Sequence, residues 1–384
     1  KVIIRVDFNV PLDKNFNVTD NSRLIAALPT INKVAKEGGK AILISHLGRP
    51  KNGFDDKLSL QHIVNSLSIL LKNKVSFCRD CIGDTTSKDV DNMKNGDILV
   101  LENLRFYKEE TQGDLVFAKK LSDLADIYVN DAFGTAHRSH ASTAIIANFF
   151  PKKKFFGLLL YKELENLKRA LENPKRPFTA IIGGAKISGK IDVIQSLFNK
   201  VDNLIIGGGM AYTFAKAIGG SIGKSLVEDD KLDLARKLIA ESQEKGVNLI
   251  LPIDSVNANR FNNDAKIIKS NISNINQEYI GMDIGAKSIE KFSEIILKSK
   301  TIVWNGPMGV FEMQNFQAGT KLVGEAICRA TKNGAFSLVG GGDSVSAVNQ
   351  FKFSKEITYL STGGGAMLEF LEGKKLPGVE AILD

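Results

Sequence analysis

Cysteine and long apolar segments are both scarce in this chain. Only three cysteines (Cys78, Cys81 and Cys328) occur among its 384 residues, and an odd number without paired spacing does not build a disulfide framework. No apolar run approaches the ~20 residues that a membrane-spanning helix needs. The opening KVIIRVDFNV predicts a strand rather than a signal peptide. We therefore expect a cytoplasmic protein that does not act at a membrane.

Cys78 and Cys81 form a C-x-x-C pair, which allows two interpretations. The spacing suits a redox pair or half of a metal site, but no second pair completes a zinc site. The other interpretation is two incidental thiols beside the end of a strand, and this is the one that we favour.

Two familiar nucleotide-binding motifs are also missing. The sequence contains no G-x-x-x-x-G-K-[ST], and no G-x-G-x-x-G followed by an acidic residue. A dehydrogenase on a doubly wound scaffold would carry the second motif after a strand, so its absence disfavours that class of enzyme.

Positive charge is concentrated in the first half. Of the net charge of +8, residues 1–170 carry +6 and residues 171–384 carry +2, and seven of the eleven arginines lie before residue 171. The planar fork of arginine suits carboxylate and phosphate groups. A nucleic-acid surface would need a basic stripe with interleaved aromatic residues, whereas the one tight basic run is Lys152–Lys154. We expect a small anionic substrate and no nucleic acid.

Short apolar runs alternate with amphipathic segments along the whole chain, as is typical of α/β domains with right-handed crossovers. We predict strands at 2–6, 41–45, 97–101, 126–130, 178–184, 203–209, 248–252, 301–306 and 336–342. We predict helices at 22–37, 60–71, 161–171, 232–244 and 289–297. The length suits two domains, and the charged helix at 161–171 is the expected connector. The predicted fold class is α/β, with two doubly wound domains, each a parallel sheet flanked by helices.

Glycines follow the predicted strands of the second half, at 183–184, 207–209, 340–342 and 363–365. Ligands of open α/β sheets bind beyond the carboxyl ends of the strands. Glycine there lets backbone N–H groups approach a ligand closely, and a following helix N-terminus favours anions. One such turn is often only tight packing, but four in one domain predict a nucleotide site.

Charged residues accompany these glycines. Lys186 and Lys190 would share the first turn of a helix if residues 186–197 are helical. Such a pair is often only an exposed surface feature, but beside a glycine turn we favour contacts to phosphate. Asp343 suits a helix N-cap and also a Mg²⁺ ligand beside polyphosphate, and the two roles are compatible.

Polar and cationic residues follow the predicted strands of the first half. They lie in the segments DFN (7–9), SHLGRP (45–50), ENLRF (102–106) and NDAFGTAHRSH (130–140), while Arg23 opens the first helix. A single arginine is usually a surface residue. Four at equivalent places in the topology predict that this half binds a small polyanion, with phosphoryl transfer to or from a nucleotide on the second half.

Several long segments resemble the phosphoglycerate kinases in family order. They are RVDFNVPL (5–12), SHLGRP (45–50), LENLRF (101–106), NDAFGTAHRSHAS (130–142), GGAKISGK (183–190), GGGMAYTF (207–214), VWNGPMGVFE (303–312), GGGDSV (340–345) and STGGGAMLEFLEGKKLPGV (361–379). Together they span nearly the whole chain. One departure is Gly189, where many relatives carry a polar or acidic residue.

The resemblance implies a monomeric, hinge-bending glycolytic kinase that converts 1,3-bisphosphoglycerate and MgADP reversibly to 3-phosphoglycerate and MgATP. It implies that residues 1–165 bind the phosphoglycerate, that residues 166–370 bind ADP or ATP, and that residues 371–384 return to the first domain. Both nucleophiles, a carboxylate and an ADP phosphate, are already anions at neutral pH. We therefore expect direct in-line transfer after hinge closure, without a general base or a covalent intermediate.

The resemblance also implies roles for residues at matching positions. The glycerate and its phosphate would bind to Asp7, Asn9, Arg23, His46, Arg49, Arg105 and Arg138. The nucleotide would bind to Lys186, Lys190, Gly207, Gly208, Gly209, Glu312, Gly340, Gly341, Gly342, Asp343 and Ser344. Within these sets, Glu312 would meet the ribose and Asp343 the Mg²⁺. The moving phosphoryl group would be contacted by Arg23, Lys186, Gly342 and Gly365.

A protein of another class, a catalytically silent scaffold or surface adhesin that kept the fold, would be expected to have lost site residues. Arg23, Lys186, Lys190 and Asp343 are all present, which favours an active enzyme.

Overall fold

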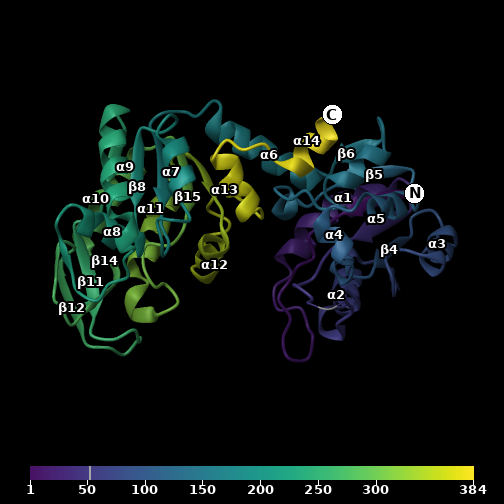
Figure 1. The fold of residues 1–384 in the computed structure, drawn as a ribbon, viewed down its shortest axis with the longest axis horizontal. Coiled ribbons are helices and arrows are strands. Elements are labelled where there is room, and N and C mark those ends of the chain that lie inside the picture. Colours follow the sequence, from purple (N-terminus) through teal and green to yellow (C-terminus); the bar gives the residue numbers. More distant parts are fainter. Residues whose placement is uncertain (52) are drawn as a thin grey trace. The chain divides into compact units, whose positions relative to one another are not determined.

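The computed structural model describes residues 1–51 and 53–384, which divide into two compact units (Figure 1). Unit 1 comprises Lys1–Glu165 and Lys375–Asp384, and unit 2 comprises Asn166–Lys374. The chain passes between them inside helix α6 (Leu158–Leu171) and again just before the last helix. Each unit has its own central sheet.

The sheet of unit 1 has six strands, and every neighbouring pair is parallel. In spatial order they are β3 (Val75–Cys78), β4 (Ile98–Leu101), β2 (Ala41–Ile44), β1 (Val2–Arg5), β5 (Ile127–Asn130) and β6 (Lys154–Phe156). The inner strands β2 and β4 are buried along their whole length. This agrees with the apolar runs that predicted them, because a sheet covered on both faces needs apolar residues on both.

Helices cover both faces of this sheet. They are α1 (Ser22–Lys36), α2 (Gln61–Leu71), α3 (Asp84–Asp91), α4 (Lys108–Gln112), α5 (Leu115–Ser122) and α14 (Pro377–Leu383), with 3-10 helices η1 (Asp56–Leu58), η2 (Leu104–Phe106), η3 (Phe133–Thr135) and η4 (Ile145–Phe149). Successive side chains of a strand point to opposite faces. Accordingly, Ile4 packs with Leu24 of α1, whereas Ile3 lies in the other core with Phe117 of α5.

Unit 2 repeats the parallel architecture around a second six-stranded sheet. Its strands, in spatial order, are β10 (Asn248–Ile250), β8 (Asn203–Ile206), β7 (Phe178–Ile182), β15 (Thr301–Asn305), β16 (Phe336–Val339) and β17 (Tyr359–Leu360). The helices are α7 (Ile191–Leu197), α8 (Met210–Ala217), α9 (Leu232–Glu244), α10 (Ala286–Lys298), α11 (Ala318–Lys332), α12 (Gly342–Gln350) and α13 (Gly365–Leu371), with η5 (Asp229–Lys231) and η6 (Gln314–Phe316). On one face, Trp304 packs with Phe292 and Val323. The parallel sheets and flanking helices confirm the predicted fold class.

Unit 2 also contains small sheets that the apolar pattern did not predict. An antiparallel sheet has the order β12 (Ile267–Asn271), β11 (Asp254–Ala258), β14 (Ile280–Ile284), and β9 (Ser221–Ile222) pairs with β13 (Asn274–Ile275). Strand β12 is an edge strand without a fully buried residue, so it lacks the apolar run by which the other strands are recognised. Within the described ranges, none of the helices combines the length and apolar character needed to cross a membrane.

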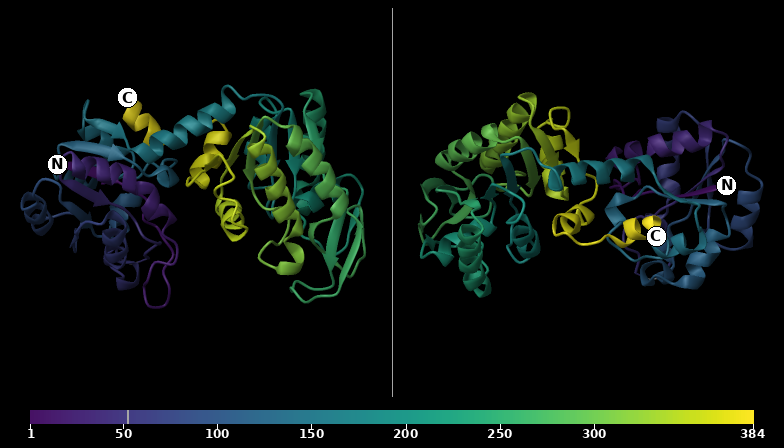
Figure 2. Two further views of the ribbon diagram at one scale, coloured as in Figure 1. Left: turned by 180° about the vertical axis from the view of Figure 1, so that it is seen from behind. Right: turned by 90° about the horizontal axis from the view of Figure 1, so that it is seen from above.

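Two neighbouring residues at the end of β5 hold segments that lead toward unit 2. Asn130 Nδ2 donates to the carbonyl of Gly378 in α14 at 3.1 Å. Asp131 Oδ1 accepts from the backbone N–H groups of Leu159 and Leu160 in the first turn of α6, at 2.9 and 3.2 Å. A methyl group on Gly157 would lie 2.1 Å from that same oxygen, so the approach of Asp131 to the helix requires glycine at 157. Figure 2 shows α14, in yellow, on the unit that carries the N-terminus.

The carboxyl of Asp131 should make stability depend on pH. Burial raises its pKa from 3.8 to about 7, and this outweighs the lowering by hydrogen bonds from Thr30, Leu160 and Leu159. The folded state therefore holds this proton more tightly than the unfolded chain, so the stabilisation is complete below about pH 4 and lost as pH rises through about 7. Asp131→Asn keeps the acceptor oxygen but cannot lose a proton. We predict that, as pH rises through this window, the unfolding free energy of the wild type falls relative to that of Asp131→Asn by up to about 1.4 kcal/mol per pH unit.

The measurement is hydrogen exchange of β5 peptides in urea at several pH values. Asp283 in unit 2 is a matched control, because its pKa is also raised by burial to about 7. Asp283→Asn should change the pH dependence of unit 2, reported by Trp304 fluorescence, and leave that of unit 1 unchanged. Parallel stability curves for wild type and Asp131→Asn would contradict the prediction.

Candidate active site

In unit 1 the polar residues predicted from the sequence gather beyond the carboxyl ends of the strands. Parallel pairing aligns Arg5 of β1 with Ile44 of β2 and with Asn130 of β5, so the three strands end at one level. The residues that follow these ends, and the end of β4, include Asp7, Asn9, His46, Arg49, Arg105 and Arg138. The register of the sheet therefore brings together groups that are far apart in the sequence.

The backbone N–H and carbonyl of Gly48 connect two of these residues. Asn9 Oδ1 accepts from its N–H at 2.8 Å, and Arg105 Nη1 donates to its carbonyl at 2.8 Å. Nearby, Arg23 Nη1 forms an ion pair with Asp7 Oδ2 at 2.6 Å. Arg23 stays 37% exposed and so remains available to a ligand, while Asp7 holds its orientation.

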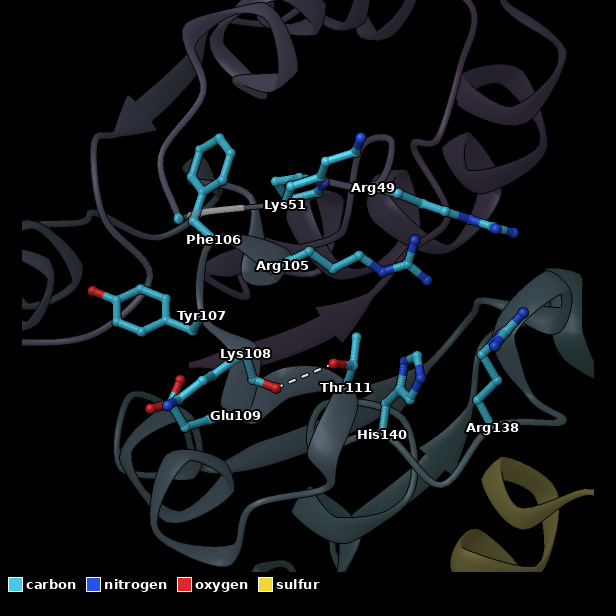
Figure 3. A pocket seen from close by; sticks show the side chains of 12 residues that line it. Arg49, Lys51, Arg105, Phe106, Tyr107, Lys108, Glu109, Thr111, Arg138 and His140 are labelled. Atoms are coloured by element: carbon cyan, nitrogen blue, oxygen red, sulfur yellow. Dashed lines mark hydrogen bonds between the residues drawn. The ribbon is translucent and has the colours of Figure 1, made fainter.

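A cavity of about 900 Å³ opens beside this cluster (Figure 3). Figure 3 shows the guanidinium groups of Arg49 and Arg105 pointing to one side of it, with His140 and Arg138 on the same side. The remaining lining residues are Pro50, Lys51, Gly53, Phe106, Tyr107, Lys108, Glu109 and Thr111. Asp7, Asn9, Arg23 and His46 do not line this cavity, so the structure divides the predicted substrate residues into two adjoining groups.

Burial and repulsion between like charges lower the pKa values of two residues in this region. Burial, together with the nearby positive charges of Arg5 and Arg138, lowers the pKa of Arg105 to about 10. The guanidinium nevertheless remains charged at neutral pH. Burial, followed by the charges of Arg105 and Arg5, lowers the pKa of His140 to about 4. His140 is therefore neutral at pH 7, beside arginine cations that attract an anion.

Sequence reasoning missed three residues beneath this site: Arg5, Glu110 and Ser142. Arg5 and Glu110 are both fully buried. The available signal was an arginine inside an otherwise apolar strand, because a charge at such a position is buried and needs partners.

In unit 2 the glycine turns meet through backbone contacts at the ends of neighbouring strands. The N–H of Gly184 donates to the carbonyl of Pro307 at 3.1 Å, and that of Gly208 donates to Met308 at 3.1 Å. A methyl group on Gly183 would lie 2.2 Å from the carbonyl oxygen of Pro307. Gly340 follows β16, and its N–H donates to Trp304 at 3.1 Å. Three of the four predicted glycine turns thus adjoin the segment after β15.

Asn305 lies between these turns, and sequence reasoning also missed its role. Its Oδ1 accepts a hydrogen bond from Lys190 Nζ, and its Nδ2 donates to the carbonyl of Gly340 at 2.7 Å. Burial lowers the pKa of Lys190, while the carboxylates of Asp343 and Glu372 raise it. The Ser344 hydroxyl accepts from the N–H of Gly306 at 2.6 Å. These contacts bring Lys190, Gly340, Asp343 and Ser344 into one neighbourhood.

The sequence allowed a helix over residues 186–197, but the observed helix starts five residues later, at Ile191. Helix α7 starts at Ile191, and Lys190 N–H donates to the carbonyl of Ile187 at 2.8 Å in a turn that precedes it. Ser188 N–H donates to Glu228 Oε2 at 3.1 Å, which holds this loop outside the helix. Lys186 and Lys190 therefore do not share a helical face. Lys186 is exposed in the loop, and Lys190 is partly buried.

The other predicted nucleotide residues lie at the ends of loops and helices. Gly207, Gly208 and Gly209 form the turn into α8, and Gly341 and Gly342 lead into α12. Gly365 is the first residue of α13, with Gly363 two residues before it. Glu312 is exposed in the loop after β15. Asp343 is exposed in the first turn of α12.

The residues of unit 2 can be compared with what Mg²⁺ requires. Across residues 1–51 and 53–384, no group of three or more His, Cys, Asp or Glu side chains has the arrangement of a metal site. Mg²⁺ in nucleotide sites is commonly held by one or two carboxylates together with substrate phosphates. The exposed Asp343 carboxylate, near the Lys190 ammonium, fits the role of a single protein ligand of this kind.

The thiols of the C-x-x-C pair, in unit 1, have the character of buried structural cysteines. Cys78 and Cys81 are both about 1% exposed. Burial raises the pKa of Cys78 and raises that of Cys81 well above its usual value. A thiol with a raised pKa is a poor metal ligand and nucleophile at neutral pH, which supports the interpretation of two incidental thiols.

Comparison with known proteins places the whole chain in one family. The family model described as phosphoglycerate kinase matches residues 1–374. The chain belongs to the phosphoglycerate kinase family. It is 54% identical to a phosphoglycerate kinase of Porphyromonas gingivalis over 406 residues, which cover all of this chain and 97% of the relative. It is 53% identical to that of Dictyoglomus turgidum, over all of this chain and 96% of the relative.

Solved structures of the family agree with this membership. The phosphoglycerate kinase of Coxiella burnetii has a TM-score of 0.89 at 41% identity, and that of Pyrococcus horikoshii has 0.87 at 32%. Each comparison covers all of this chain and 95% of the other chain. The chain is accordingly a phosphotransferase of glycolysis that acts on a carboxyl group of phosphoglycerate and uses ATP and ADP as its other substrates.

A pair of glycine substitutions tests whether close backbone contact organises the nucleotide turns. Gly183→Ala places a methyl group 2.2 Å from the Pro307 carbonyl oxygen, whereas Gly189→Ala meets no atom within 4 Å. We predict that Gly183→Ala lowers the unfolding free energy of unit 2 by about 1–3 kcal/mol. Gly189→Ala should stay within about 0.5 kcal/mol of the wild type. Urea unfolding followed by Trp304 fluorescence measures both, and equal stabilities of the two variants would refute the prediction.

Proposed function

We propose that this chain transfers a phosphoryl group reversibly from 1,3-bisphosphoglycerate to MgADP, giving 3-phosphoglycerate and MgATP. The observation that carries the proposal is the division of chemistry between the units. Arg49, Arg105 and Arg138 line one cavity in unit 1, whereas Gly340 and Lys190 meet at Asn305 among the glycine turns of unit 2. The first arrangement suits a small polyanion and the second suits the phosphates of a nucleotide.

In unit 1, the arginine forks bind the carboxylate and the phosphate that is not transferred. The proposed contacts are Asp7, Asn9, Arg23, His46, Arg49, Arg105 and Arg138. The fixed orientations of Arg23 by Asp7 and of Arg105 by Gly48 support this assignment. Groups whose orientation is set before the substrate binds lose less entropy when it arrives.

In unit 2, Lys186 and Lys190 bind nucleotide phosphates and Glu312 binds the ribose hydroxyls. Backbone N–H groups contribute at Gly207–Gly209 and Gly340–Gly342, together with Ser344. The proximity of Lys190 to Asp343 and Gly340 supports a shared phosphate site. We further propose that Asp343 binds Mg²⁺, which would neutralise phosphate charge when bound.

Transfer is proposed to be direct and in line, without a general base or a covalent intermediate. The carboxylate of 3-phosphoglycerate and the phosphate of ADP are anions before reaction, so neither needs to lose a proton. Arg23, Lys186 and the backbone N–H groups at Gly342 and Gly365 would stabilise the negative charge of the moving phosphoryl group. The lowered pKa of His140 supports this mechanism, because a base suited to neutral pH would have a pKa near 7.

We also propose that residues 1–165 form the phosphoglycerate-binding domain and residues 166–370 the nucleotide-binding domain. Residues 371–384 return to the first domain. The contact of Gly378 with Asn130 and Ala136 supports the last assignment. A monomer acting in the cytoplasm, with small-molecule substrates as its only required partners, is the simplest working state.

A coupled assay with 3-phosphoglycerate and MgATP tests the activity and its two main cations. We predict turnover by the unaltered chain, and a fall in kcat of about 10²–10³-fold for Arg23→Ala or Lys186→Ala, with smaller changes in KM. Lys298→Ala is the control, because Lys298 is an exposed lysine at the end of α10. A lack of turnover would refute the function, whereas near-wild-type kcat in Lys186→Ala would refute only the role of Lys186.

Closure by a hinge is the other part of the proposal, because substrates held on different domains must meet with water excluded. The proposed hinge regions are the helix at 161–171 and the segment at 362–371. We predict that 3-phosphoglycerate and MgATP together reduce the radius of gyration in small-angle scattering. Each substrate alone is the control and should give a smaller change. An unchanged radius with both substrates would exclude closure.

A further inference from the structure

Arg5 is a fully buried cation beneath the phosphoglycerate site. Its Nε donates to the Ser142 hydroxyl at 2.9 Å, and Nη1 donates to the carbonyl of Val6. Its Nη2 lies 3.2 Å from Nδ1 of His46. A buried guanidinium is tolerated only when its N–H groups have partners, so these three contacts define the position of the fork.

The carboxylate of Glu110 is linked to Arg5 through the side chain of Ser142. Glu110 is also fully buried, and its Oε1 accepts from the Ser142 hydroxyl at 2.7 Å while Oε2 accepts from the Ser142 N–H at 2.9 Å. The hydroxyl has a single proton, which it donates to the carboxylate. Its oxygen is therefore left to accept from Arg5, and every hydrogen bond in this chain has a defined direction.

The hydrogen bond between Arg5 Nη2 and His46 Nδ1 determines the tautomer of His46. A guanidinium has only donors, so His46 Nδ1 must accept with its lone pair. A neutral imidazole with an unprotonated Nδ1 carries its hydrogen on Nε2. His46 is therefore a neutral ring whose one N–H donor is at the ε position.

We propose that Arg5 is a positioning residue for phosphoglycerate binding, which holds His46 as the Nε2–H tautomer so that its ring donates a hydrogen bond to the anionic substrate. The proposal rests on the proposed function for the identity of the substrate. It adds residues outside the substrate-binding set assigned above, and it assigns His46 the role of a neutral donor.

The burial and the charges around His46 also favour its neutral form. Burial comes first and lowers its pKa well below the usual value, and Arg5, Arg105, Arg23 and His140 lower it further. The three arginines come from β1, η2 and α1, so cationic side chains approach the ring from several elements. Protonation of His46 would place a further positive charge among these arginines, which disfavours the cationic ring.

A plain buried ion pair between Glu110 and Arg5 is the competing explanation. Such a pair would affect stability when broken, but it would leave the tautomer of His46 undetermined and would not change the binding of one substrate selectively. The two explanations can therefore be separated by a spectroscopic measurement and by a comparison of KM values.

The first experiment is nitrogen NMR of the unaltered chain with ¹⁵N-labelled histidine. The four histidines give few signals, and His46→Gln assigns the one of interest. We expect the long-range proton–nitrogen pattern of a ring protonated at Nε2 only at neutral pH, because the pKa of His46 is lowered well below its usual value. A ring protonated at Nδ1, or at both nitrogens at neutral pH, would overturn the proposal whatever the activity of the enzyme.

The second experiment uses two substitutions that break the chain at different points. Arg5→Lys keeps the charge but has no planar fork, and Ser142→Ala removes the oxygen that links Arg5 to Glu110. We expect each to raise KM for 3-phosphoglycerate about tenfold, the effect of losing one hydrogen bond to a charged group. KM for ATP should stay within about twofold.

Ser87→Ala is the matched control, because Ser87 is an exposed serine of unit 1 that bonds only to its own helix turn, at Gly83. Its kinetic constants should equal those of the wild type. If Arg5→Lys does not fold, Ser142→Ala and the measurement on the unaltered chain still decide the matter. Equal changes in both KM values, or an unchanged KM for 3-phosphoglycerate in a folded variant, would show that the network serves stability alone.

Discussion

Parallel register is the constraint on which both sites depend. Arg5, Ile44 and Asn130 lie level across three strands of unit 1, and Ile182 is paired with both Ile206 and Asn305 in unit 2. Parallel strands have no tight hairpin between them, so every carboxyl end is followed by a loop on the same edge of the sheet. Residues that are more than a hundred positions apart thereby reach one place, without any special contact between the segments that carry them.

The two units use this shared edge in different ways. Unit 1 extends side chains from it, and its arginines are oriented by Asp7 and by the Gly48 peptide. Unit 2 brings backbone to it, and Gly183 allows the turns to approach Pro307 more closely than a side chain would permit. Side-chain forks suit a small anion whose shape must be recognised, whereas backbone N–H groups suit phosphates that are common to many nucleotides.

The site of unit 1 also depends on buried charged residues. Arg5 and Glu110 are both removed from water and are joined through Ser142. Burial, followed by the positive charges of Arg105 and Arg5, lowers the pKa of His140 to about 4 and keeps it neutral at pH 7. A site built in this way presents positive charge to an anion.

Much of this protein can be predicted from its sequence, because apolar runs and glycine positions are local properties. The nine predicted strands, the glycine turns and the arginine-bearing loops all depend on neighbouring residues in the chain. The sheet at β11, β12 and β14 could not be predicted, since its partly exposed strands lack a buried apolar run. Nor could the sequence show that α7 begins only at Ile191, because that depends on a contact between Ser188 and the distant Glu228. The partners of Arg5, and the side of the His46 ring that carries the hydrogen, were decided only by tertiary structure. They depend on Glu110 and Ser142, which are distant in the chain and are brought beneath the site by the packing of other elements.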